Sequence, residues 1–330
     1  MRTEVSDEKG VRGRFAPTPS GYLHLGNVFT ALCAFVQARM QGGQFILRIE
    51  DVDSPRCRPS YTTQILEDLL WLGFDWDEGP DVGGSRGPYL QSECGPIYRK
   101  AMDSLTQRGY LYPCFCSRSA LAFVASAPHG LASQGPAYPG TCRHLNMADA
   151  ALLAKRKKPA LRFRIPERPL EVEDGVHGLV RFPEGFGGDF VVSRADGVVA
   201  YQLAVVVDDA RQGITDVVRG EDLLDSTARQ VWLYEALGLP VPRFAHVPIV
   251  HGPDGRRLQK RDKSVAVLDM AKRGVASEKI IGCLAFLAGW TKARIPLSPT
   301  DVLDLVHPDA PLPRAASITL DAESMEWMSR

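Results

Sequence analysis

The chain has 330 residues, of which 45% are hydrophobic and 24% charged, ordinary values for a folded globular protein. Lysine plus arginine equal aspartate plus glutamate at 39 each, so the zero net charge gives no support to indiscriminate nucleic-acid binding. The sequence lacks an uncharged apolar run of about 18 residues and the apolar core of a signal peptide. We therefore expect one or two domains in a cytoplasmic protein without a membrane span.

The first 75 residues alternate between strand-like and helix-like patterns. Residues 26–40 carry apolar side chains at helical spacing, and residues 45–49 form an apolar run typical of a buried strand. A second helix is predicted over 61–73, ending at Gly73. This order predicts a βαβ unit, and with it an α/β fold around a parallel sheet.

The regular alternation stops near residue 113. Residues 124–141 are rich in glycine and proline and predict an extended loop, and 148–159 predict a short helix. The lysines and arginine at 155–158 suit a solvated helix end, with RNA contact as the alternative. The turn RADG at 194–197 lies between two apolar runs and predicts a hairpin. A helix is expected from about Ser226, and a peripheral tail after Trp290.

The stretch GRFAPTPSGYLHLGN, residues 13–27, controls its backbone closely with prolines and glycines. Phe15 can end a strand and Gly26 can begin a helix, which leaves free N–H groups at a helix N-terminus. Such a terminus attracts anions, and His24 beside it can donate to phosphoryl oxygens. Arg14 can hold a carboxylate with two hydrogen bonds. The pattern alone indicates an anion site, with a tight structural turn and a surface histidine as the alternative.

Four segments together resemble the class I aminoacyl-tRNA synthetases. RFAPTPSGYLHLGN resembles their first nucleotide-binding motif, in the form of the glutamyl and glutaminyl branch. LRIEDVDSPR, VVVDDARQGITDVVRGEDLLDSTARQ and VPIVHGPDGRRLQKRDKS follow in the branch's order, so the resemblance covers residues 11–264. It implies a Rossmann-type class I synthetase catalytic domain with a parallel sheet, a zinc-bearing insertion and a short helical stem region.

The resemblance implies an ATP site built from His24, Gly26, Asn27 and Lys260, with His24 and Lys260 as catalytic residues. RLQKR, residues 257–261, stands where the family carries its KMSKS loop, and Lys260 takes the place of the phosphate-contacting lysine. Arg257 replaces the family's first lysine, Gln259 replaces its first serine and Arg261 takes the last place of the motif, so the segment stays strongly basic. A solvated basic turn is the alternative. Mg²⁺ is expected to bridge the ATP phosphates.

A glutamate site is also implied. Glutamate has two carboxylates and one ammonium, so a selective pocket needs two arginines and a carboxylate. Arg14 and Arg219 match the two arginines, and which of them binds the side-chain carboxylate is left open. Glu50 matches the carboxylate that receives the ammonium. The full set of expected glutamate-binding residues is Arg14, Phe15, Ala16, Pro17, Thr18, Glu50, Tyr201 and Arg219.

Three cysteines within 29 residues predict a structural tetrahedral zinc site in an intracellular protein: Cys114, Cys116 and Cys142. Tyr138, His129 and His144 are all available for the fourth position, and ligand chemistry alone favours a histidine. The pattern C-x-C, then Y-x3-C, is similar to that of the glutamyl-Q tRNA(Asp) synthetases, and this resemblance implies Tyr138. Three free thiols without a metal are the alternative.

Only 66 residues follow Ser264, too few for the helical anticodon-binding domain of a glutamyl-tRNA synthetase. The predicted domains are the first half of the catalytic domain, the zinc-binding and acceptor-contacting insertion, the second half with the lysine loop, and the helical stem with the tail. Their predicted bounds are 11–112, 113–200, 201–264 and 265–330.

The resemblance implies activation of L-glutamate with ATP and its transfer to the queuosine base of tRNA(Asp), by a monomer. A truncated glutamyl-tRNA synthetase that works with a separate anticodon-binding partner is the main alternative. A synthetase-like binding protein without catalysis, and a ligase that attaches glutamate to a carrier protein, remain as further hypotheses.

Overall fold

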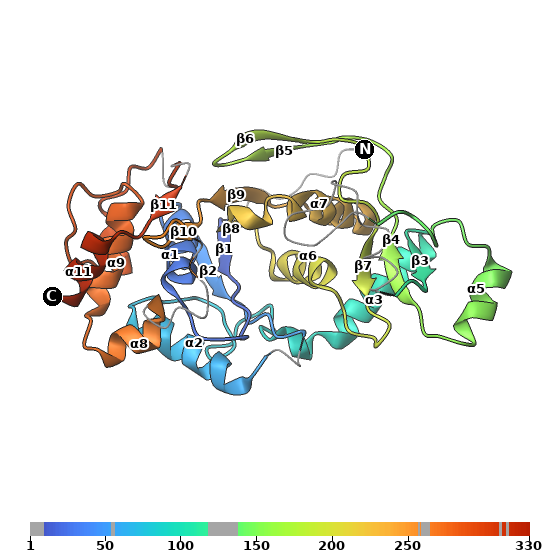
Figure 1. Ribbon diagram of the computed structural model, residues 1–330, viewed down its shortest axis with the longest axis horizontal. Coiled ribbons are helices and arrows are strands. Elements are labelled where there is room, and N and C mark those ends of the chain that lie inside the picture. The colour runs from blue at the N-terminus through green and yellow to red at the C-terminus, as the bar shows by residue number, and fades with distance from the viewer. Residues whose placement is uncertain are drawn as a thin grey trace.

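The structure is a computed structural model, and it describes residues 10–53, 57–117, 138–256, 258, 265–309, 312–314 and 317–330. A six-stranded sheet, in the order β2-β1-β8-β9-β5-β6, crosses the molecule (Figure 1). Its neighbouring strands run parallel except for the antiparallel hairpin β5–β6 at one edge. The strands are β1 (Arg12–Phe15), β2 (Gln44–Leu47), β5 (Leu170–Asp174), β6 (Gly178–Phe182), β8 (Asp216–Gly220) and β9 (Arg243–Val247).

Helix α1 (Leu25–Arg39) packs closely against the sheet and is buried along most of its length. A Cβ added to Gly13 in β1 would lie 3.0 Å from the Cβ of Ala38, so the glycine allows the helix and strand to approach. The remaining helices of this part are α2 (Pro59–Trp71), α3 (Gly95–Gln107), α6 (Tyr201–Gln212) and α7 (Ser226–Leu237), with 3-10 turns η2 (Gln91–Glu93) and η3 (Glu221–Leu223).

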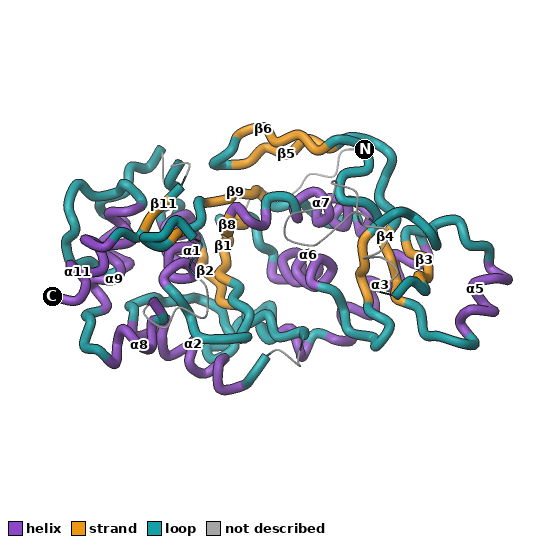
Figure 2. The backbone as a smooth tube through the Cα atoms, in the orientation of Figure 1, coloured by secondary structure: helices purple, strands orange, loops and turns teal. Residues whose placement is uncertain are grey.

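A second, three-stranded antiparallel sheet lies at one end of the molecule, apart from the central sheet (Figure 2). It consists of β3 (Leu111–Cys114), β4 (Ala160–Phe163) and β7 (Phe190–Ser193). Helix α5 (Met147–Ala154) lies beyond this sheet, at the extreme of that end, and buries none of its side chains.

The C-terminal part lies at the opposite end and contains α8 (Val267–Lys272), α9 (Ser277–Leu287), α10 (Pro299–Leu303) and α11 (Ala322–Ser329). β10 (Val250–His251) and β11 (Ile318–Thr319) form a short parallel pair. Leu320 and Met328 are buried in the same apolar core as α1. This region differs from the expected peripheral tail, because its apolar side chains cover the sheet and α1.

The structure contains the predicted helices and the predicted strand of the βαβ unit as α1, β2 and α2. Helix α5 and the helix from Ser226 also agree with the sequence-based prediction. The predicted RADG hairpin is present in a short form, because Ser193 and Val199 make an antiparallel bridge across the turn. The rest of the second apolar run, from Tyr201, forms α6 and not a strand. Since α6 is buried on nearly all faces, its sequence lacks the polar stripe that marks an amphipathic helix. None of the helices in the described ranges combines the length and apolarity needed to span a bilayer.

Candidate active site

A cavity of about 660 Å³ opens at the carboxyl ends of β1 and β8, beside the N-terminus of α1. In α/β sheets this is the edge at which ligands bind. Lys260 lies outside the described residues, although Leu258, two positions before it, lines the cavity. The other predicted glutamate and ATP residues all line it: Arg14, Phe15, Ala16, Pro17, Thr18, His24, Gly26, Asn27, Glu50, Tyr201 and Arg219.

His24 occupies the N-cap position of α1 with an extended backbone. The side chain of Asn27 accepts a hydrogen bond from the backbone N–H of His24 at 3.2 Å, which fixes the start of the helix. A Cβ on Gly26 would lie 3.1 Å from two atoms of the His24 ring. The glycine therefore lets the imidazole lie against the helix start, where the helix dipole favours an anion.

A chain of alternating charges lies under the cavity. The Arg14 guanidinium contacts Asp209 at 3.3 Å, and Arg48 contacts the same carboxylate at 2.6 Å and Glu50 at 3.2 Å. All four side chains are at most 7% exposed. Burial works against ionisation of Asp209, but Arg48 and Arg14 outweigh it and hold the pKa of this carboxyl below its usual range.

At Glu50 the effect of burial is the larger one, so the pKa of this carboxyl is raised although Arg48 and Arg14 act to lower it. A positively charged ligand group beside Glu50 would lower this pKa and favour the ionised carboxylate. Tyr201, the first residue of α6, lines the same space, and its hydroxyl makes no hydrogen bond to the described residues. Both groups are placed to meet a polar ligand.

Arg219 approaches from β8 and is only 4% exposed. Its Nη1 donates to Gln230 at 2.7 Å, its Nη2 donates to Thr227 at 2.8 Å, and its Nε donates to His246 at 2.9 Å. Because these bonds fix the guanidinium plane, the orientation of the positive group is set before a ligand arrives.

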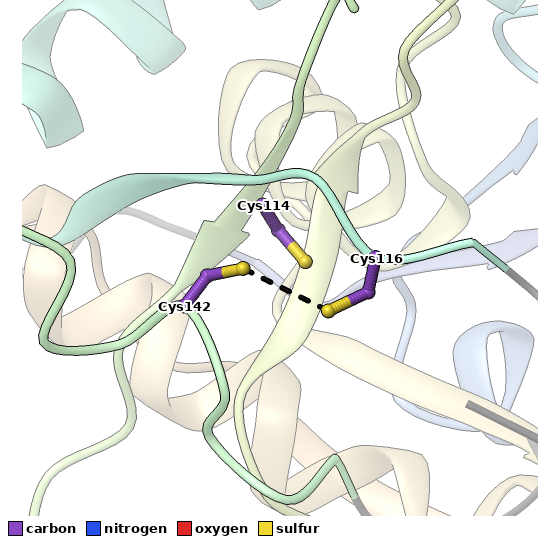
Figure 3. A group of neighbouring side chains, drawn as sticks. All are labelled: Cys114, Cys116 and Cys142. Carbon is purple, nitrogen blue, oxygen red and sulfur yellow. Dashed lines mark hydrogen bonds between the residues drawn. The ribbon is translucent and has the colours of Figure 1, made fainter. Parts of the chain in front are cut away.

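The three predicted cysteine ligands lie together beside the second sheet (Figure 3). Their sulfurs are within 4.8 Å of one another, and those of Cys116 and Cys142 are 3.7 Å apart. The Tyr138 hydroxyl lies 3.5 Å from the sulfur of Cys114 and 3.7 Å from that of Cys116. The structure thus brings the phenol, and the three thiols, into one cluster.

These distances fit a tetrahedral zinc ion. Zn–S bonds of about 2.3 Å and Zn–O bonds of about 2.0 Å separate ligand atoms by about 3.5–3.8 Å. Arg162 donates from Nε to Cys114 at 3.2 Å, and its guanidinium carbon lies 3.7 Å above the Tyr138 ring. Burial raises the pKa of the Cys114 thiol, but its bonds with Tyr138 and Arg162 outweigh this and lower the pKa. Among the alternative ligands, His144 is exposed, and His129 lies outside the described residues.

Comparison with known proteins agrees with this architecture. Residues 10–296 match the family described as class I tRNA synthetases (E and Q), catalytic domain. A relative from Symbiobacterium thermophilum, named glutamyl-Q tRNA(Asp) synthetase, is 54% identical over 96% of this chain and 98% of its own length. The chain belongs to the glutamyl-Q tRNA(Asp) synthetase family. It is therefore an enzyme, a class I tRNA synthetase and a ligase.

The glutamate–tRNA ligases that this chain resembles are longer than the chain. A glutamate–tRNA ligase from Sulfurihydrogenibium is 44% identical over 84% of this chain, which corresponds to 58% of that ligase. The crystal structure of a glutamate–tRNA synthetase from Elizabethkingia anophelis superposes with a TM-score of 0.81 at 30% identity, covering 97% of this chain and 70% of that one. The predicted class I synthetase fold is confirmed.

The structure adds residues that the sequence-based interpretation of this family member missed. Asp209 and Arg48 bridge Arg14 to Glu50, and His246 contacts Arg219. One signal was present, because two aspartates end the apolar run VVVDD and an arginine interrupts the buried strand FILRIE. Charged residues inside apolar runs are rarely buried unless they are paired. His246 carries no such signal, since its partners come from distant strands.

Proposed function

We propose that this synthetase activates L-glutamate with ATP and transfers the glutamyl group to the queuosine base of tRNA(Asp). The observation that carries the proposal is the single cavity that joins two buried arginines and a buried carboxylate to a helix N-terminus. The name of the relative with 54% identity supports the same substrate and acceptor.

The glutamate end of the cavity matches its ligand in charge. Among the lining side chains, Arg14 and Arg219 are positive and Glu50 is negative. Glutamate offers two carboxylates and one ammonium to these three groups, whereas glutamine has one carboxylate and would leave one arginine unpaired. We assign Arg14 and Arg219 to the two carboxylates, Glu50 to the ammonium, and the Thr18 and Tyr201 hydroxyls to further hydrogen bonds.

The nucleotide end is assigned to the start of α1. His24 and the N–H groups at the helix N-terminus would hold phosphate oxygens, with Gly26 and Asn27 shaping the turn. Lys260, two positions after the cavity-lining Leu258, would supply the second cation. Mg²⁺ bound to ATP would neutralise further phosphate charge.

Two displacements then complete the reaction. An oxygen of the α-carboxylate attacks the α-phosphorus of ATP, and pyrophosphate leaves with the electron pair of the broken P–O bond. A hydroxyl of the acceptor next attacks the carbonyl carbon of the mixed anhydride, AMP leaves, and an ester forms as the hydroxyl proton departs. The protein contributes alignment and fixed positive charge in both steps.

We further propose a structural zinc ion held by Cys114, Cys116, Tyr138 and Cys142. With four protein ligands the ion would have no open position for substrate, so its contribution is to stabilise the second sheet. The distances within the cluster and the contacts of Arg162 support this assignment.

The decisive experiment compares labelled glutamate transfer to tRNA(Asp) with and without queuosine, in the presence of ATP. We expect a labelled ester only on the queuosine-containing tRNA. Equal labelling of unmodified tRNA(Asp) would refute the acceptor, and labelled tRNA(Glu) would favour the truncated glutamyl-tRNA synthetase. Label on protein would indicate a carrier as acceptor. Absence of glutamate-dependent ATP–pyrophosphate exchange, even with tRNA present, would indicate a binding protein without catalysis.

A further inference from the structure

Three buried side chains from neighbouring strands of the central sheet form a hydrogen-bonded line that ends in the cavity. Asp174 lies in β5, His246 in β9 and Arg219 in β8, and none is more than 4% exposed. The Asp174 carboxylate lies 2.6 Å from Nδ1 of His246, and Nε2 of His246 lies 2.9 Å from Nε of Arg219. Only Arg219 lines the cavity.

The acceptors along this line fix the proton on the imidazole. One Asp174 oxygen accepts the backbone N–H groups of Val176, His177 and His246, at 3.0, 3.0 and 3.2 Å. The other oxygen therefore faces Nδ1 of a group that must donate, so the ring carries its proton on Nδ1. Nε2 is left as an acceptor, and the Arg219 guanidinium can only donate to it.

The other contacts of Arg219 are consistent with this direction. Thr227 accepts from Nη2 of Arg219 at 2.8 Å, so its hydroxyl proton is free to donate to Nε2 of His246 at 3.2 Å. The imidazole nitrogen is thus an acceptor for two donors. A proton on Nε2 would oppose both of them, and the guanidinium would have to turn away.

We propose that Asp174 and His246 are positioning residues that hold the Arg219 guanidinium in the orientation that receives a carboxylate of the amino-acid substrate. The inference rests on the proposed function, because it takes glutamate as the ligand of Arg219. The β5–β6 hairpin, which does not line the cavity, would thereby help to orient Arg219. Asp174 is its last residue before the turn, and it acts through one imidazole.

The sharpest test is Asp174→Asn, which keeps the shape of the side chain. Its carbonyl oxygen can still accept the three backbone N–H groups, but its amide would donate to Nδ1 and so move the ring proton to Nε2. We expect the glutamate dissociation constant, measured by calorimetry, to rise about 10–100-fold, the loss of one hydrogen bond to a charged group. The dissociation constant of a non-hydrolysable ATP analogue should stay within about twofold.

A pair of variants at the ring gives a second comparison. His246→Gln can place an amide oxygen near the position of Nε2 and should retain much of the glutamate affinity, whereas His246→Met offers no such acceptor. His307→Asn is the matched control, because this histidine is exposed and lies outside the line of hydrogen bonds. A merely structural role would weaken glutamate and nucleotide binding together and would give no rescue by glutamine.

A measurement on the ring itself separates this inference from the proposed function. Nitrogen-15 spectra of the histidines should show an Nδ1–H tautomer for His246, and its Nε2 resonance should move in Arg219→Met. An Nε2–H tautomer, or unchanged glutamate affinity in Asp174→Asn, would overturn the inference. If the wild-type chain bound no glutamate, the proposed substrate would fail, while the tautomer would still decide whether His246 accepts from Arg219.

Discussion

The glutamate end of the cavity and the cysteine cluster are both rich in ionisable groups, but they balance charge differently. Under the cavity, Arg14, Arg48, Asp209 and Glu50 neutralise one another through protein contacts. In the cluster, three thiols and one phenol, which all become negative when they lose a proton, face one another. Among the described residues, Arg162 supplies a positive charge in contact with Cys114 and Tyr138. The first region is organised by its own side chains, whereas the second requires a bound cation once its ligands lose their protons.

The comparison predicts the largest effect at the cluster. Cys142→Ser should lose most of the bound zinc, measured by mass spectrometry of the metal, and unfold at a lower temperature, because metal binding contributes directly to folding. Tyr138→Phe should weaken zinc binding on the order of tenfold or more. Cys57→Ser is the control. Zinc loss in His144→Asn, but not in Tyr138→Phe, would show that the fourth ligand is the histidine.

The next effect is expected where the buried charges meet the substrate. Arg14→Met removes a carboxylate partner and one of the two cations on Asp209, so kcat/KM for glutamate should fall about 10²–10³-fold, corresponding to roughly 3–4 kcal/mol. Arg181→Met, at an exposed ion pair of the β5–β6 hairpin, is the control. An unchanged kcat/KM in Arg14→Met would remove Arg14 from the glutamate site.

The buried imidazole predicts a pH dependence of stability. Burial, together with the charges of Arg219 and His177, lowers the pKa of His246 to about 4 against the raising effect of Asp174. Between pH 6.5 and 4 the unfolded chain takes up a proton that the folded chain rejects. The contribution of His246 to the free energy of unfolding should therefore be largest above pH 6.5. The free energy of unfolding should fall by up to about 3 kcal/mol as the pH is lowered to 4. Denaturant titrations at several pH values should find this slope absent in His246→Met.

The smallest effect is expected at the start of α1. Gly26→Ala would press a methyl group on the His24 ring, so KM for ATP should rise about tenfold while glutamate affinity is kept. Alanine favours a helix over glycine, so the melting temperature should not fall. Gly95→Ala, in the first turn of α3 with its nearest neighbour 3.6 Å away, is the matched control. Equal loss of both affinities would point to a general distortion.

Local patterns were sufficient to predict α1, β2 and α2, because each alternates apolar and polar residues or is bounded by glycine and proline. They failed at α6, where burial on nearly all faces removes the helical stripe. The residues grouped around the cavity were found through a resemblance over four separate segments. Their supports were not, since Asp174 and His246 are 72 positions apart and meet only through strand order.

The short pair β10–β11 ties two distant parts of the chain. Val250 and His251 precede the basic segment by a few residues, and they pair with Ile318 and Thr319, while Leu320 donates to the His251 carbonyl at 2.8 Å. The residues that precede the segment proposed to bind the nucleotide are thus anchored by a strand from the last fifteen residues. Removing the residues from Ile318 onward, or fusing a bulky tag there, would remove the strand partner of Val250 and His251. The position of these two residues would then be less fixed, although no residue assigned to a substrate is altered.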